Sequence, residues 1–221
     1  AVTVPNASRT RYSDAIVAEN CLGKTTSATR RLTNQRLGEL YGLDPTIPLF
    51  RVLRRVWDLD EPGRPLAALL CAIARDPLLA ATAAAVLPLR SGEEFQRNTM
   101  RTALREAVGA RLNDAILDKV VRNTASSWTQ SGHLDGRTFK RRRLVRATPA
   151  TLAYALYLGH AAGYRGGELF TSGWCRLLDC DGAEARELAL DAKRLGLVDL
   201  RISADVVTID PARLDPATMG V

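Results

Sequence analysis

The pattern of apolar and polar residues predicts helices through most of the chain. From Thr25, the segment TTSATRRLTNQRLGELYGL places Leu32, Leu37 and Leu40 on one helical face, with its arginines largely off that face. Pro48 then begins a second helix, PLFRVLRRVWDL, with apolar side chains inward and arginines outside. The first third of the chain therefore predicts two amphipathic helices with basic outer surfaces.

A long apolar stretch, residues 65–89, is interrupted near its middle. Arg75, Asp76 and Pro77 divide it into runs of about ten residues, and each run is half of the roughly 20 residues that cross a bilayer. We therefore expect a buried helical hairpin and no membrane partner. Capping signals predict further helices at residues 91–108, at 113–131, from Thr148 onward, at 172–178 and at 181–196.

The hydrophobic period changes after residue 196, where LVDLRISADVVTIDP alternates around a turn at residues 203–205 and predicts a β-hairpin. Residues 132–137 and 196–201 share the pattern Gly-x-[Leu/Val]-Asp-x-Arg, each directly after a long amphipathic helix. A helix followed by a two-stranded ribbon is how a winged helix ends, so the repeat indicates two wings, with a chance match as the alternative. In the first wing, Asp135-Gly136 is at or near the turn.

These elements predict a mainly α fold with helical bundle-like domains and small winged-helix-like β-hairpins. We expect a flexible or loosely docked N-terminal arm at residues 1–24 and a basic helical domain at 25–147 that ends in a wing. A C-terminal winged-helix-like domain follows at 148–221.

The charge is distributed unevenly between the two halves of this fold. The formal charge is +7 and 27 of the 31 basic residues are arginine, the side chain best suited to paired hydrogen bonds with phosphate. Residues 1–146 carry a net +10, whereas residues 147–221 carry −3. Any surface that binds a polyanion is therefore expected in the first two thirds of the chain.

Two clusters of cations are the candidate binding residues. The first lies on the helices at residues 25–59 and comprises Arg30, Arg31, Arg36, Arg51, Arg54 and Arg55. The second lies in the first wing and comprises Arg137, Lys140, Arg141, Arg142, Arg143 and Arg146. If a helix lies in a groove of a nucleic acid and a wing follows its backbone, the two clusters can neutralise phosphates at the same time.

Strand alternation divides the second cluster. Arg141, Arg143 and Val145 lie on one side of the expected returning strand, and Lys140, Arg142, Leu144 and Arg146 lie on the other. Part of the cluster must face solvent, because burying several unpaired guanidinium groups is costly. The nearby aromatic residues Trp128 and Phe139 are expected in the core. The preceding helix offers polar contacts from Asn123, Thr124, Ser126, Ser127 and Gln130.

The sequence offers little catalytic chemistry. It contains no GxSxG, HExxH or P-loop motif, and His133 and His160 belong to no recognisable constellation. The four cysteines form no CxxC pair, so reduced and mostly buried thiols are expected instead of a zinc site. We expect a non-enzymatic protein with no cofactor, no metal and no small-molecule substrate. The absence of a signal-peptide core near the first residue favours a cytoplasmic location.

The order of segments resembles the BrxA-like family of the BREX phage-exclusion systems. The likeness covers roughly residues 25–160 and lies in TTSATRRLTNQRLGEL, LLCAIARDPLLAATAAAVLPL, DKVVRNTASSWTQSGHLDG and KRRRLVRATPATLAYAL. It implies a small, mainly helical cytoplasmic protein that binds double-stranded DNA. It also implies an accessory role beside other subunits of a phage-defence complex, without methyltransferase or nuclease activity.

Two other functions fit the same residues. The chain would be a protein–protein adaptor if its cations meet an acidic subunit and its acidic C-terminal part forms a second contact. It would be an RNA-binding protein if the helical domain carries the interface. A solvated, arginine-rich surface without a partner is the remaining interpretation.

Overall fold

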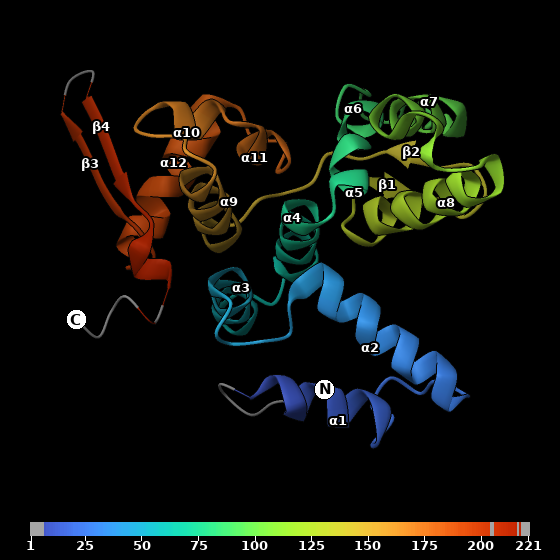
Figure 1. The fold of residues 1–221 in the computed structure, drawn as a ribbon. Helices are drawn as coiled ribbons and strands as arrows, with labels where there is room; N and C mark the ends of the chain where they lie inside the picture. The colour runs from blue at the N-terminus through green and yellow to red at the C-terminus, as the bar shows by residue number, and fades with distance from the viewer. Residues whose placement is uncertain (1–6, 204–205, 216, 218–221) are drawn as a thin grey trace.

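The computed structural model describes residues 7–203, 206–215 and 217, and it is mainly helical with two small antiparallel hairpins, which confirms the predicted fold class (Figure 1). The first half contains α1 (Arg9–Val17), α2 (Ser27–Tyr41), α3 (Pro48–Leu59), α4 (Arg64–Arg75), α5 (Pro77–Ala81), α6 (Ala83–Val86), α7 (Arg97–Val108), η1 (Gly109–Arg111), α8 (Asp114–Gln130), β1 (Leu134–Asp135) and β2 (Arg141–Arg142). The second half contains α9 (Pro149–Ala161), α10 (Glu168–Thr171), α11 (Gly173–Arg176), α12 (Gly182–Arg194), β3 (Asp199–Ser203), β4 (Val206–Asp210) and η2 (Ala212–Leu214).

The N-terminal arm, expected to be flexible or loosely docked, is a docked helix where the structure describes it. Ser8 caps α1, and Tyr12 and Ile16 are buried. The Tyr12 ring meets Phe50 of α3 edge to face, with 5.4 Å between ring centroids. Of the two expectations for this arm, residues 9–17 fit the docked one, because a short apolar stripe in an otherwise polar segment packs against the core.

The apolar stretch folds as a broken pair of helices, as its sequence predicts. Asp76 ends α4 and caps α5, accepting hydrogen bonds from the backbone N–H groups of Leu78 (2.9 Å) and Leu79 (3.2 Å). In the part of the chain that the structure describes, no single helix is long and apolar enough to span a membrane. The segments Arg64–Arg75 and Pro77–Val86 reach that length only together, across a bend of 107°.

Residues 77–147 follow the order of elements of a winged helix, ending in the first hairpin. We call this segment the first winged unit. Helices α5 and α6 precede a single bridge residue, Glu94, which pairs with Arg141; α7, a turn, α8, β1 and β2 follow. The core between the helices includes Trp128, whose indole N–H donates to the Thr82 hydroxyl at 2.8 Å. Trp128 is fully buried, as predicted.

A second unit after residue 147 has a similar order, helices α9–α12 and then the hairpin β3–β4, without a bridge residue among its described helices. Thr148 and Asp181 form capping boxes that begin α9 and α12, and β3 pairs with β4 from Asp199–Asp210 to Ser203–Val206. Both predicted hairpins are therefore confirmed, although residues 204–205 of the predicted turn lie outside the described residues. Figure 1 shows the two hairpins on opposite sides of the molecule. The domain boundary at residue 147 stays a prediction.

Ion pairs between described residues join the second unit to the rest of the chain. Arg51 on α3 binds Asp215 with two hydrogen bonds, Nε to Oδ1 at 2.6 Å and Nη2 to Oδ2 at 2.8 Å. Arg142 on β2 pairs with Asp179, which lies just before α12. Helix α9 also packs against both α3 and α4, so the two halves share one buried core.

The four cysteines are free thiols in two environments. Cys71, Cys175 and Cys180 are buried, whereas Cys21 is exposed. Burial raises the pKa of Cys71 and Cys175 to about 11 and that of Cys180 to about 12.

Candidate nucleic-acid interface

Helix α8 presents a polar and cationic face to solvent. Leu117, Val121 and Trp128 are buried at helical spacing against the rest of the first winged unit, whereas Ile116 in the first turn is 47% exposed. The opposite face therefore points outward, and all its members are exposed: Lys119, Arg122, Asn123, Ser126 and Gln130. In a helix–turn–helix arrangement, the second helix is the one that enters the major groove.

Ion pairs between α7 and α8 neutralise the acidic residues at the start of α8. Arg101 contacts both Asp114 and Asp118 at 2.9 Å, and Arg105 contacts Asp114 at 2.6 Å. The hydrogen bond to Asp118 raises the pKa of Arg101. Lys119 and Arg122 have no ion-pair partner among the described residues, so the outward face keeps a net positive charge.

The first wing has a turn that requires glycine. Gly136 has φ +106°, and a Cβ there would lie 2.1 Å from the Phe139 carbonyl oxygen. Asp135 accepts a hydrogen bond from the Gly136 N–H at 2.9 Å, and β1 pairs with β2 through Leu134–Arg142 and Asp135–Arg141. The Asp-Gly pair is therefore part of the turn, as the sequence predicts.

Arg142 is not a surface cation, which corrects its place among the candidate binding residues. Its side chain is fully buried and pairs with Asp179, and it also donates to the backbone carbonyl of Arg143. The alternation of strand β2 directs Arg142 inward while Arg141 and Arg143 remain exposed. A buried guanidinium is tolerated here because a carboxylate 37 positions away compensates its charge.

The remaining wing residues gather on one exposed hairpin. Lys140 Nζ donates to the Thr129 hydroxyl of α8 at 2.7 Å, which connects the wing to the end of that helix. Arg141 donates to the Gly92 carbonyl at 3.0 Å, and Arg143 lies 3.7 Å from Asp135 with 67% of its side chain exposed. Arg137 is exposed without an ion-pair partner among the described residues. Arg146 lies beyond β2 and lines a cleft with the acidic residues of α12, so it does not belong to this hairpin. The wing therefore adjoins the end of α8 through the bond between Lys140 and Thr129.

Two apolar side chains on the wing are also exposed. Phe139 is 74% exposed and Leu144 is 63% exposed. The expectation that Phe139 belongs to the core is therefore wrong. An exposed ring beside cations can stack on a base or a sugar.

The arginines of the first cluster, on α2 and α3, contact different parts of the molecule. Arg51 and Arg55 reach the C-terminal segment, at Asp215 and at the backbone carbonyl of Arg213. Arg54 lies 3.4 Å from Asp58, and Arg30 donates to the Val17 carbonyl at 3.0 Å. Arg31 is exposed on α2. These residues therefore do not form a single surface with the wing.

Arg36 is the member of the first cluster that lies near α8. It lines a groove of about 770 Å³ between α2, α5 and α8, together with Lys119, Asn123 and Ser127. Arg36 also pairs with Glu39 at 2.7 Å, which lowers the pKa of that carboxyl group. The groove extends the outward face of α8 toward α2.

Sequence reasoning missed Lys119 and Arg122. Neither belongs to a run of cations, which is why charge clustering overlooked them. Their signal is the spacing 119, 122, 123, 126 and 130, which follows one helical face opposite the buried residues of α8.

His133, just before β1, is a buried residue that is held by hydrogen bonds. Its ring is buried against Trp128, edge to face, with 4.9 Å between centroids. Nε2 lies 2.9 Å from the Leu177 carbonyl oxygen and Nδ1 lies 2.8 Å from the Ser131 hydroxyl. Because a carbonyl can only accept, Nε2 carries the proton. Burial lowers the pKa of His133 to about 4, so the ring is neutral at pH 7.

Comparison with known proteins finds no match: no protein-family model, no curated protein and no solved structure is similar to this chain.

Proposed function

We propose that this protein binds double-stranded DNA, with α8 in the major groove and the β1–β2 wing along the adjoining phosphates. One observation carries the proposal: Lys140 of the wing is hydrogen-bonded to the end of α8, so the wing lies beside the helix whose polar and cationic face points outward. Helix–turn–helix proteins place their second helix in the major groove. The cations supply the sequence-independent attraction to phosphate.

The chemistry of the α8 face fits base edges. Asn123 and Gln130 carry amide groups that pair with adenine in the major groove, and Arg122 has the fork that binds guanine. The exposed wing arginines, Arg137 and Arg143, are suited to phosphate contacts, which position a protein without reading sequence. The proposed interface therefore combines one reading helix with one positioning hairpin.

The proposed role is that of a non-enzymatic, cytoplasmic accessory protein of a phage-defence complex. This part rests on the resemblance to BrxA-like proteins over residues 25–160. Other subunits of such a complex would be its protein partners, and they would supply the catalytic activities.

Fluorescence anisotropy tests the proposed binding. The full chain is titrated with a labelled DNA duplex, with single-stranded RNA of the same sequence, and with single-stranded DNA, each at several salt concentrations. If the protein binds DNA as proposed, its affinity is highest for the duplex. The logarithm of that affinity should fall linearly with the logarithm of the salt concentration. Tighter binding to RNA, or no binding to any of the three at low salt, would overturn the proposal.

A protein–protein adaptor is the second candidate, and the acidic face of α12 favours it. Glu184, Glu187 and Asp191 follow one side of α12 and line a cleft of about 260 Å³ beside Arg146. Helix α12 occupies the same place in the second unit that α8 occupies in the first winged unit. Its carboxylates would nevertheless repel phosphate. Co-purification of a basic partner that is lost in a Glu184→Gln, Glu187→Gln variant would support the adaptor function.

A further inference from the structure

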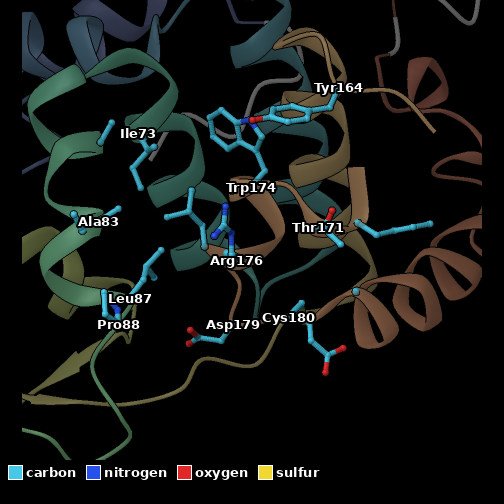
Figure 2. Close-up of a pocket in the computed structure, with 17 residues that line it drawn as sticks. Ile73, Ala83, Leu87, Pro88, Tyr164, Thr171, Trp174, Arg176, Asp179 and Cys180 are labelled. Atoms are coloured by element: carbon cyan, nitrogen blue, oxygen red, sulfur yellow. The ribbon is translucent and has the colours of Figure 1, made fainter. Parts of the chain in front are cut away.

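A cleft separates the short helices of the two units on the side away from the second hairpin. It has a volume of about 860 Å³ and lies between α4–α6 and α10–α12 (Figure 2). Small side chains make the first wall open, because Ala80, Ala83 and Ala84 project little into the space. Ile73 and Leu87 complete an apolar surface on that wall. Volumes of this size are typical of small-molecule sites.

Two aromatic rings lie at one end of the cleft. Tyr164, which is 41% exposed, and Trp174 both come from the second unit, and Figure 2 shows them together at the end opposite Asp179 and Cys180. Trp174 lies close to α9: a Cβ on Gly159 would be in contact distance of its Cδ1 atom (3.4 Å) and too close to Leu169 Cδ2 (2.9 Å). The indole is therefore packed against α9 while it remains part of the lining.

Arg176 supplies the free charge of the cleft. It lies between the aromatic end and the acidic end in Figure 2, its side chain is exposed, and it has no ion-pair partner among the described residues. The carboxylates of the lining are engaged elsewhere. Asp179 pairs with Arg142 and accepts the Val145 N–H at 2.8 Å. Asp181 caps α12 through the N–H groups of Ala183 (2.8 Å) and Glu184 (2.9 Å).

We propose that this cleft binds a small organic anion that carries an aromatic ring. The ring would contact Trp174 and Tyr164 and the apolar wall of alanines, and the carboxylate or other acid group would accept hydrogen bonds from the Arg176 guanidinium. The ligand is bound noncovalently, because burial raises the pKa of the lining thiol, Cys180, to about 12 and keeps it protonated. It would be a regulatory ligand and not a substrate, and the site does not depend on the proposed DNA binding.

Isothermal titration calorimetry without DNA tests this site, with naphthalene-2-carboxylate and naphthalene-2-carboxamide as matched probes. The carboxylate is expected to bind about tenfold more tightly than the amide, because a hydrogen bond to a charged group is the stronger one. Arg176→Gln should remove that preference. Arg194→Gln, which changes an exposed arginine on α12 with 75% of its side chain exposed, should leave it unchanged.

A second variant, Ala84→Phe, fills the cleft from an exposed position and should abolish binding of both probes. Circular dichroism is used to check that both variants are folded. If Ala84→Phe does not fold, the comparison of wild type with Arg176→Gln still tests the proposal. Two results would overturn the proposal: no heat of binding with millimolar carboxylate, or a carboxylate preference that survives Arg176→Gln.

Discussion

Arg142 of β2 and Asp179, 37 positions later, form a buried ion pair that fixes the first wing to the second unit. Asp179 has φ +55° and accepts the Val145 N–H at 2.8 Å as well, so one carboxylate binds both the wing strand and the segment that follows it. His133 adds a parallel contact through the Leu177 carbonyl. The orientation of the wing therefore depends on the loop that precedes α12.

Removing the charge of Asp179 is expected to destabilise the whole fold. Asp179→Asn keeps the size of the side chain and tolerates the positive φ, but it leaves the Arg142 guanidinium buried without a counter-charge. We expect the free energy of unfolding to fall by about 3 kcal/mol, measured by urea denaturation. Asp191→Asn is the matched control, because its exposed pair with Arg194 is worth less than about 1 kcal/mol. Equal effects of the two variants would contradict the structural role of the buried pair.

Stability is expected to depend on pH through His133. Burial lowers its pKa in the folded state from 6.5 to about 4, an effect that Arg142 reinforces and Asp179 opposes. Between these pH values the unfolded chain binds more protons, so the stabilisation is complete above about pH 6.5 and is lost as the pH falls toward 4, by about 3 kcal/mol. His133→Gln should flatten this part of the stability profile in urea titrations, and an unchanged profile in that variant would contradict the role of His133.

Two arginines of the wing should contribute to the salt dependence of duplex binding. Arg137→Ala with Arg143→Ala removes two exposed cations, and the slope of log affinity against log salt is expected to become shallower by up to about 0.9 for each phosphate that the variant no longer neutralises. Arg201→Ala, at an exposed position of the other hairpin, is the matched control and should leave the slope unchanged. An unaltered slope in the wing variant would exclude the wing from the interface.

The face of α8 should determine affinity more strongly than the corresponding helix of the second unit. Lys119→Ala with Arg122→Ala is expected to weaken duplex binding about tenfold or more, since good contacts to bases are worth about 1–3 kcal/mol each. Lys193→Ala with Arg194→Ala makes the same change at two exposed positions of α12 and should have little effect. Anisotropy titrations at one salt concentration compare the two variants. A larger reduction of affinity in the α12 variant would reverse the assignment of the binding helix.

The sequence predicts the elements of this fold better than it predicts the directions of its charged side chains. Caps at Thr148 and Asp181, the break at Asp76-Pro77 and the two hairpins are local signals, and the structure confirms them. Leu32 lies on the apolar face that the sequence predicts for α2, but it is 52% exposed, because α2 packs only part of that face against its neighbours.

The misassigned arginines share one cause, which is distance along the chain. Arg51 is bound by Asp215 and Arg142 by Asp179, partners 164 and 37 positions away. A run of cations read along the sequence cannot reveal which guanidinium has such a partner, since that requires the packing of the second unit on the first. Lys119 and Arg122 were missed for the opposite reason, because their common face appears only once α8 is known to bury Leu117 and Trp128.

The different environments of the cysteines give the molecule a selective point of chemical attachment. Cys71, Cys175 and Cys180 are buried with raised pKa values, while Cys21 is exposed just beyond α1. A maleimide fluorophore would therefore react with the folded chain at Cys21 first. Figure 1 shows α1 apart from β1, β2 and α8. A fluorophore on the residue just beyond α1 would therefore report the molecule's tumbling without occupying the proposed interface.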